Sequence, residues 1–580
     1  MLDWELTRMK AWHLGNTTVR SAFRLREGIA ALASSPLLGD LKGREKESQF
    51  AWLLHEAGVV SLDRGAKEDV SDLGRKWRSA ATQLGFLVPE ISGSEIGLDQ
   101  SRVGLPFSLT ENGRRLIASE TVPAMQECFL RSLAAYRIPS VLEKRYEVDQ
   151  FSPLRHVISI MLELERRTGD SRLDFIEIAV VVQVTSPVDD LSQICDRILD
   201  FRSSRVASSN KRRFDNEALK LAHQIYDLAE GTFRDYADCN IRYLKATGIV
   251  SSAGRGISII PTKRMLATQL IAQPWPSLSS ISYLKQLFVG SPLPTDEKET
   301  AKLVLDDLIE SARARGIIYD IAGRPAVEVP DISILRFEVE ELIAEENEIA
   351  FAADQVNLVD EISAYLRLIA ERGTSITLSN GESISLPKSE APAYFEWATW
   401  RAFLAMRELV NKPYESRRFK VDQDLLPFGV APCGGTDLIF EFEDFLLVVE
   451  VTLTESSRQE AAEGESVRRH VAKVARDHFL KGGEKKVYGL FLANKIDSNT
   501  AETFRIGVWY SNDDSMTQLD IVPVSLGAFR EFFISVFESG DQGHEVLRRI
   551  LGLSIARRNI PGGGPVWKSE IDDLVRSSRG

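Results

Sequence analysis

The amino-acid sequence predicts a multidomain α/β protein in which helices predominate and the sheet lies towards the C-terminus. Its 580 residues correspond to about three to five domains of usual size. Segments with helical periodicity fill most of the first two thirds of the chain, whereas strand-like runs gather after residue 430. We therefore divide the chain into four segments. Their predicted boundaries are 1–145, 146–275, 276–375 and 376–580.

The first segment predicts two helices followed by a short β element. Helices are expected over 45–60 and over 68–88, and the stretch 106–119 is expected to form a strand, a Thr-Glu-Asn-Gly turn and the start of a helix. One face of the second helix carries three basic residues, Arg75, Lys76 and Arg78. This order is typical of a winged helix, in which the second helix enters the major groove of DNA. A solvated helix face is the alternative.

The second segment repeats this layout. Helices are expected over 152–170, 171–185 and 189–204, and a further helix carries Arg242 and Lys245. A hairpin follows, with Arg255 at its tip, and a basic wing tip usually meets phosphate. Residues 201–270 hold 12 Lys and Arg against 6 Asp and Glu, although the whole chain has a net charge of −13. Two tandem winged-helix-like units therefore predict recognition of DNA over several base pairs.

The third segment is acidic and predicts long helices. Residues 271–372 hold 9 basic residues against 19 acidic ones. We interpret the segment as a helical linker. Three of its carboxylates are expected on a solvated face or, alternatively, docked on the basic units: Glu345, Glu346 and Glu348.

The fourth segment contains the most informative stretch, TDLIFEFEDFLLVVEVT, at 436–452. Apolar and charged residues alternate as far as Glu441, a polar Glu443-Asp444 pair follows, and an apolar run comes next. This pattern predicts a β-hairpin with one half-exposed strand and one largely buried strand.

A turn centred on the polar pair places Asp437 directly opposite Glu450, with their Cβ atoms about 4.5–5.5 Å apart. Two carboxylates so placed repel each other unless a cation compensates their charge. Thr452 projects from the same face of the strand. Carboxylate oxygens suit a hard cation such as Mg²⁺, so the hairpin is a candidate metal site. A solvated strand pair is the alternative.

The sequence around the hairpin predicts a mixed α/β domain. A helix over 391–409 precedes it and holds Glu396 among aromatic residues, where a carboxylate is costly unless it is paired. A helix over 456–483 follows it. Three strands are expected next, over 485–493, 504–511 and 519–526, and the glycine-rich stretch IPGGGPVW at 560–567 is expected to be a terminal linker.

Several of these motifs resemble those of the AlwI-type type IIS restriction endonucleases, a family that includes DNA-nicking relatives. The resemblance rests on FEWATW, on DLIFEFEDFLLVVEVT, and on Gln459 followed by ESVRRH from Glu465 to His470. GNTTVR at 15–20 and the helix at 238–248 match less distinctively. The hairpin also resembles the PD-(D/E)xK nuclease core, although no Pro precedes Asp437 and Thr452 stands where that fold usually has Lys.

The resemblance implies a Mg²⁺-dependent enzyme with one or two metal ions. It would bind a short asymmetric double-stranded DNA site through its N-terminal region and cut a few base pairs away through its C-terminal domain. By position, the catalytic carboxylates are Glu396, Asp437, Glu450 and Glu465. Thr452 is expected to orient water, and His470, Arg468 and Arg469 are candidates to stabilise the scissile phosphate, with helix packing as the alternative for His470.

The resemblance also implies partners and leaves alternatives. A cognate DNA methyltransferase is expected, and cutting both strands requires a transient homodimer or a second nuclease subunit. A strand-specific nickase, an inactive DNA-binding regulator and a metal-dependent phosphatase or nucleotide hydrolase are the alternatives. No P-loop motif is visible, so ATP-driven action is not expected.

Composition predicts a soluble cytoplasmic protein. Its N-terminus has no apolar signal core, and no apolar run approaches the roughly 20 residues of a membrane span. The four cysteines are far apart in sequence and form no CxxC motif, which argues against a structural zinc site or a disulfide framework.

Overall fold

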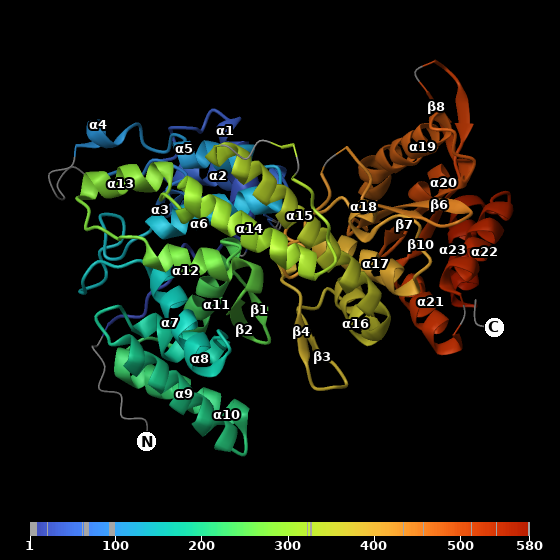
Figure 1. Ribbon diagram of the computed structural model, residues 1–580. Helices are drawn as coiled ribbons and strands as arrows, with labels where there is room; N and C mark the ends of the chain where they lie inside the picture. The colour runs from blue at the N-terminus through green and yellow to red at the C-terminus, as the bar shows by residue number, and fades with distance from the viewer. Residues whose placement is uncertain are drawn as a thin grey trace. The chain divides into compact units, whose positions relative to one another are not determined.

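The computed structural model divides the chain into two compact units, Met1–Ile343 and Ala344–Gly580 (Figure 1). It describes residues 9–19, 21–60, 62, 69–91, 99–321, 323–324, 328–432, 434–455, 457–511, 513–540 and 542–577. Four residues of the motifs and segments above lie outside the described ranges: Arg20, Glu68, Cys433 and Ser456. The finer division into four segments stays a prediction. Each of the two units contains helices and at least one β-sheet, which confirms the multidomain α/β class.

The described part of the first unit is mainly helical. Its helices are α1 (Arg24–Ala33), α2 (Arg44–Glu56), α3 (Ser71–Gln83), α4 (Gln100–Val103), α5 (Glu111–Ala118), α6 (Val122–Ala135), α7 (Pro153–Thr168), α8 (Phe175–Val180), α9 (Leu191–Ala207), α10 (Lys211–Tyr226), α11 (Glu230–Ala246), α12 (Arg264–Ala272), α13 (Ser280–Val289) and α14 (Lys298–Ala314). Three 3₁₀ turns accompany them: η1 (Val182–Val184), η2 (Pro261–Lys263) and η3 (Pro294–Asp296). Helix α15 (Val329–Asp354) crosses the boundary between the units.

The predicted β element before α5 is reduced to a single bridge between Leu87 and Leu109. The predicted Thr-Glu-Asn-Gly turn is instead the start of α5, because the Thr110 hydroxyl accepts a hydrogen bond from the Gly113 amide at 2.9 Å and caps the helix. The wing predicted for the first segment is therefore absent as a hairpin from the residues described there.

The hairpin predicted in the second segment is present. Strands β1 (Val250–Ala253) and β2 (Gly256–Ile259) pair antiparallel and are joined through Gly254 and Arg255. Gly254 has φ +60°, a conformation that favours glycine and lets the chain reverse in two residues. Arg255 therefore lies at the tip, as predicted.

The helices of the acidic third segment pack against each other in the first unit and against further residues in the second. In the first unit, α14 and the first half of α15 share a small core that includes Leu305, Leu335 and Val339. Glu348, in the second half of α15, is buried and pairs with Arg417 at 2.6 Å, so the solvated face expected for it is wrong.

The second unit combines one four-stranded sheet with surrounding helices and two small hairpins. Its helices are α16 (Val359–Ala370), α17 (Ala391–Met406), α18 (Pro413–Ser416), α19 (Glu465–Leu480), α20 (Ser498–Ile506), α21 (Leu526–Ser539), α22 (Gly543–Ala556) and α23 (Gly563–Arg576), with 3₁₀ turns η4 (Gln355–Leu358) and η5 (Lys388–Glu390) and a π-helical turn η6 (Glu460–Gly464). Its strands are β3 (Ser375–Thr377), β4 (Ser383–Ser385), β5 (Leu438–Glu441), β6 (Phe445–Thr452), β7 (Lys486–Ala493), β8 (Val508–Tyr510), β9 (Met516–Gln518) and β10 (Ile521–Ser525).

The main sheet has the order β10-β7-β6-β5, with β5 antiparallel to β6 and the other neighbours parallel. Strand β6 is buried from Phe445 to Glu450, because helices cover both faces of a sheet with parallel neighbours. The core of the unit includes Trp400, Phe440, Val448 and Phe491. This packing fixes the backbone from which the candidate site projects.

Both outer edges of the main sheet are closed to further pairing. At β5, the Asn411 amide accepts from the Glu441 amide at 2.9 Å and donates to the Ile439 carbonyl at 2.8 Å. At β10, Pro523 lies within the strand and has no N–H to offer.

Two predictions for the C-terminal part are wrong. The strand expected over 504–511 is split, because Phe504 belongs to α20 and only β8 remains, paired with β9 away from the main sheet. The expected linker IPGGGPVW is the start of α23. Gly562, with φ +98°, turns the chain into this helix, and Trp567 is then fully buried, its indole donating to the Ser554 carbonyl at 2.8 Å.

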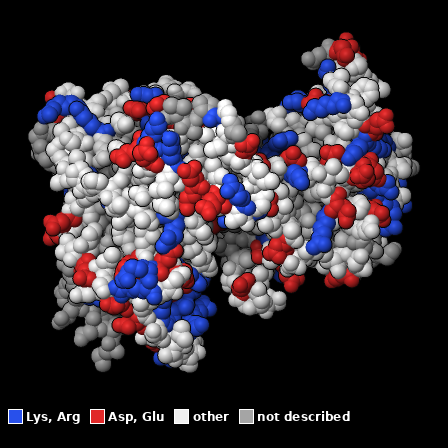
Figure 2. Space-filling model, viewed as in Figure 1, with Lys and Arg blue, Asp and Glu red and all other residues white. Residues whose placement is uncertain are grey.

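Charged side chains of both signs cover the visible face, and blue side chains gather around α9 and α10 in Figure 2. Among the described residues, no helix combines the length and the apolarity that crossing a bilayer requires.

Candidate functional site

The β5–β6 hairpin brings Asp437 and Glu450 together as predicted. Leu438 pairs with Val449 and Ile439 with Val448, and continuing this register places Asp437 opposite Glu450. The Asp437 carboxylate also accepts from the Val451 amide at 2.9 Å, which holds it across the two strands. The sequence specifies this register because a slip of one residue would turn the apolar face of β5 towards water.

Glu396 projects from α17 into the same region. Its side chain is 5% exposed and accepts a hydrogen bond from the Ala431 amide at 2.8 Å. Burial raises the pKa of Glu396 well above its usual value, and the charges of Asp437 and Glu450 raise it further.

The two hairpin carboxylates are perturbed in the same direction. Burial and the neighbouring Glu450 raise the pKa of Asp437 well above its usual range. Burial, followed by the charge of Glu463, raises the pKa of Glu450 to about 9. Carboxyl groups that burial and like charges push towards the neutral form are typical of functional sites.

His470 lies against this cluster. Its Nδ1 is 2.9 Å from Glu450 Oε1, and burial lowers the pKa of its imidazole, with Arg469 lowering it further. A neutral ring that donates from Nδ1 to the carboxylate leaves Nε2 as an acceptor. Nε2 is buried and has no hydrogen-bond partner among the described residues.

Glu463, which the sequence reasoning missed, is the acidic residue that reaches Thr452. The Thr452 hydroxyl donates to Glu463 Oε1 at 2.8 Å, whereas the predicted Glu465 has a side chain that is 61% exposed and pairs with Arg469. Helical spacing contained the signal. Glu463 precedes His470 by seven residues, which is two turns and the same face, whereas Glu465 precedes it by five and faces elsewhere.

The two arginines that precede His470, Arg468 and Arg469, differ in their contacts. Arg468 donates to the carbonyls of Gly464 and Val508 at 2.9 and 3.2 Å, so it ties α19 to β8. Arg469 keeps a half-exposed side chain and lowers the pKa of His470 by its charge.

The donor chemistry of this cluster fits a hard divalent cation. Glu396, Asp437, Glu450 and Glu463 all offer carboxylate oxygens, and their mutual repulsion is relieved when a cation binds. Across the described residues, no group of three or more His, Cys, Asp or Glu side chains is drawn together closely enough to hold a metal ion by itself.

The predicted DNA contacts of the first segment occupy two different faces of α3. Arg75 and Lys76 are exposed and both pair with Asp72 on the same helix. Arg78 is turned inward, donates to the Leu41 carbonyl at 2.8 Å and pairs with Glu47. Arg78 therefore has a packing role in this structure.

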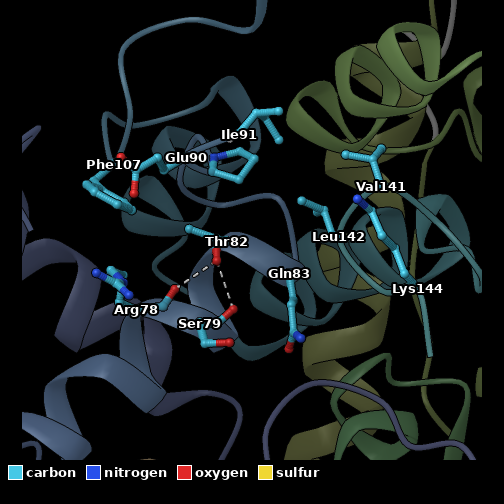
Figure 3. Close-up of a pocket in the computed structure, with 11 residues that line it drawn as sticks. Arg78, Ser79, Thr82, Gln83, Glu90, Ile91, Phe107, Val141, Leu142 and Lys144 are labelled. Atoms are coloured by element: carbon cyan, nitrogen blue, oxygen red, sulfur yellow. Dashed lines mark hydrogen bonds between the residues drawn. The ribbon is translucent and has the colours of Figure 1, made fainter. Parts of the chain in front are cut away.

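The inner face of α3 borders a cavity of about 270 Å³, shown in Figure 3. Arg78, Ser79, Thr82 and Gln83 line one side, and Lys144 lies across from them. The side-chain amide oxygen of Gln83 (Oε1) is buried and has no hydrogen-bond partner within the described ranges. The Thr82 hydroxyl is already used, since it contacts the carbonyls of Arg78 and Ser79.

The predicted contacts of the second segment also separate. Arg242 pairs with Asp238 and donates to the carbonyls of Thr17 and Val19, so it holds the N-terminal GNTTV loop against α11. Lys245, one turn further along α11, is half-buried.

Arg255 remains at the exposed tip of the β1–β2 hairpin. Its side chain is 63% exposed and pairs with Asp215 on α10 at 3.1 Å. Asp215 also binds Arg205 of α9, so the hairpin tip and the basic ends of two helices meet at one carboxylate.

The chain is similar to known proteins. Residues 82–532 match the family model described as AlwI restriction endonuclease. No curated protein matches the chain. One similar solved structure is the small subunit of the heterodimeric restriction endonuclease R.BspD6I, with 24% identity and a TM-score of 0.28 over 39% of this chain and 100% of that one. The family match spans more than half of the chain. The chain therefore belongs to the AlwI restriction endonuclease family and is a site-specific nuclease that acts on DNA.

Proposed function

We propose that this nuclease is a type IIS restriction endonuclease. Its N-terminal unit binds a short asymmetric double-stranded sequence, and its C-terminal unit hydrolyses phosphodiester bonds a few base pairs outside that sequence with Mg²⁺. The observation that carries the proposal is a cluster of three carboxylates on a helix and a hairpin of the second unit, in which Glu396 and Glu450 are buried and Asp437 is half-buried.

The carboxylates have distinct roles in this proposal. Asp437 and Glu450 bind the cation, and Glu396 completes its coordination shell. Glu463 takes the place predicted for Glu465, because Glu463 contacts Thr452 and its charge raises the pKa of Glu450. When bound, Mg²⁺ stabilises the charge that develops on the phosphate and lowers the pKa of a coordinated water.

His470 and Thr452 serve the same reaction differently. The buried acceptor His470 Nε2 is the group placed to take a proton from an attacking water, since Nδ1 is held by Glu450. The Thr452 hydroxyl is bound to Glu463, so Thr452 is a positioning residue that fixes this carboxylate.

The recognition unit is proposed to use tandem winged-helix-like modules, and the cleavage unit a PD-(D/E)xK core. Arg75, Lys76, Lys245 and Arg255 remain the proposed DNA contacts. Arg78 and Arg242 are proposed to act indirectly, by fixing the inner face of α3 and the GNTTV loop. A DNA methyltransferase of the same specificity is the proposed partner, because an enzyme that cuts a short sequence also threatens the DNA of its own cell.

The test is a cleavage reaction on long DNA of mixed sequence, with Mg²⁺ or with a chelator, followed by sequencing of the ends. We expect ends at one fixed offset from one asymmetric sequence, and only with the metal. Scattered ends would contradict the type IIS assignment. Tight binding to one sequence without cleavage under any divalent cation would favour a DNA-binding regulator.

A strand-specific nickase is the second candidate, because each chain contains one carboxylate cluster of this kind among its described residues. One such centre cuts one strand. Accumulation of nicked circles from a plasmid with one site, without linear product at any enzyme concentration, would favour it.

Replacing Glu463 or Glu465 by Gln, one at a time, tests which of the two carboxylates contributes to cleavage. We expect Glu463→Gln to lower the cleavage rate by about 10²-fold or more, because the neutral side chain no longer balances the cation. Glu465→Gln, a matched change two residues away on the exposed side, is expected to leave the rate within about twofold. The opposite pattern would restore the role predicted for Glu465.

Stability without metal is expected to fall as the pH rises. Burial raises the pKa of Glu450 from 4.5 to about 9 in the folded protein, so the folded state binds more protons than the unfolded state between these values. Urea midpoints measured from pH 5 to 9 should therefore decrease, and added Mg²⁺ should reduce the decrease. Midpoints that rise with pH in the absence of metal would contradict the burial of this carboxyl group.

A further inference from the structure

The second half of α15, together with η4 that follows it directly, turns one face towards the interior of the second unit. Glu348, Phe351 and Gln355 recur at helical spacing, so they lie on the same side of the helix axis. Glu348 and Gln355 are buried, and Phe351 packs against the apolar core. The intervening Glu346 and Asn347 are exposed. Each of the three inward side chains therefore contacts other parts of this unit.

Two of these side chains contact α17, the helix that carries Glu396. Phe351 stacks on Trp400, with ring centres 5.7 Å apart and 16° between the ring planes. Gln355 accepts a hydrogen bond from the Arg401 guanidinium at 2.5 Å. Trp400 follows Glu396 by four residues, which is about one helical turn and nearly the same face. These contacts therefore fix α17 one turn away from Glu396.

The third side chain, Glu348, pairs with Arg417. The Arg417 guanidinium donates to both carboxylate oxygens of Glu348, at 2.7 and 2.6 Å, and this bidentate geometry is strong and directional. Arg417 Nη1 also donates to the Phe419 carbonyl at 2.6 Å. The side chain of Glu348 is 4% exposed and that of Arg417 is 17% exposed. Neither side chain can leave this pair without placing an uncompensated charge in a largely buried position.

The backbone of this arginine segment holds Asp437. Arg417 forms an antiparallel bridge with Leu438, and the Arg418 amide donates to the Asp437 carbonyl at 3.2 Å. Asp437 immediately precedes β5, whose pairing with β6 begins at Leu438. The hydrogen bond from Arg418 therefore helps to fix the backbone from which the Asp437 carboxylate projects.

We infer that Glu348 and Arg417 are positioning residues for the proposed cation site. Glu348 acts through Arg417, and Arg417 acts through the backbone beside Asp437. The inference rests on the proposed function, because it assigns Asp437 and Glu396 to that site. One face of α15 holds both carboxylates, Asp437 through the ion pair and Glu396 through α17, although they come from distant parts of the sequence. A misplacement of about 1 Å caused by a distant substitution can lower a reaction rate about 10²-fold.

The test compares two variants of the full chain with the wild type. Glu348→Gln removes the charge of the carboxylate and keeps its shape, whereas Arg417→Lys keeps the charge and loses the bidentate contact. We expect each variant to lower the cleavage rate at saturating Mg²⁺ about tenfold. Without DNA, we expect Mg²⁺ to raise the urea midpoint of each variant by about half as much as that of the wild type, or less.

Glu346→Gln is the matched control, because Glu346 is an exposed carboxylate on the same helix and should change neither quantity. The difference between midpoints with and without Mg²⁺, taken within one variant, separates cation binding from stability. A variant that is merely less stable has lower midpoints in both conditions and keeps the difference between them.

The outcomes are distinguishable. Lower midpoints with a wild-type Mg²⁺ shift and a wild-type cleavage rate would mean that the pair only stabilises the fold, and would overturn the inference. A lower rate with an unchanged Mg²⁺ shift also overturns it, because the pair then acts elsewhere than at the cation site. Both results leave the proposed function intact. Absence of cleavage by the wild type with Mg²⁺ overturns the proposed function, and the inference with it.

Discussion

Replacing Glu450 by Gln is expected to lower DNA cleavage by about 10³-fold or more while making the metal-free protein more stable. The cation loses a charged ligand, while the amide oxygen of Gln can still accept a hydrogen bond from His470 Nδ1. Without metal, however, the same change removes a buried acid whose pKa is raised to about 9, so folding at neutral pH no longer requires this side chain to take up a proton. A gain of about 1 kcal/mol is expected at neutral pH. Asp437→Asn should behave in the same way.

Single-turnover cleavage with saturating Mg²⁺ and urea unfolding in a chelator measure the two effects on one preparation. Glu443→Gln is the control, because Glu443 is exposed in the turn of the same hairpin and should change neither quantity. A Glu450→Gln enzyme that retained a tenth of the wild-type rate would rule out this carboxylate as a ligand. A loss of stability without metal would contradict the cost of burying it.

Replacing Arg401 by Ala is expected to cost the second unit about 3–5 kcal/mol of stability. The guanidinium is 1% exposed, donates to Gln355 at 2.5 Å and Glu361 at 2.6 Å, and lies 4.5 Å from the ring centre of Trp397. Its removal leaves the buried Gln355 oxygen without its donor and opens a cavity beside α17, the helix that carries Glu396.

Calorimetry of the full chain should show this loss in the transition of one unit. Arg367→Ala on α16 is the control, because Arg367 is half exposed and its pair with Glu371 contributes little. A change of less than about 1 kcal/mol for Arg401→Ala would mean that solvent replaces these contacts.

The part of the site that lies on regular strands was predictable from sequence. Apolar and charged residues alternate strictly up to Glu441, and a polar pair follows at the turn. Both features define the register that brings Asp437 and Glu450 together. Glu396 was predictable for a related reason, since a carboxylate among aromatic residues has to find a compensating environment.

The irregular parts were not predictable in the same way. Glu463 lies in a π-helical turn, and although its spacing from His470 places both on one helix face, the motif pointed to the exposed Glu465 instead. The glycines before Trp567 indicated a linker, although they form the turn into a packed helix.

Long-range contacts of the basic residues were also not predictable. The basic residues of the predicted recognition helices are equivalent in sequence, but only tertiary structure shows that Arg242 holds the GNTTV loop and Arg78 binds Leu41 and Glu47. Periodicity identifies a helix face but does not identify what packs against it.

The closed edges of the main sheet have a consequence for how this enzyme behaves at high concentration. An open edge strand pairs with other chains and leads to aggregation. Here the Asn411 amide occupies the hydrogen-bonding groups of β5, and Pro523 interrupts those of β10. Intermolecular sheet extension is therefore blocked on both sides, so concentrated solutions of this chain should resist fibre formation.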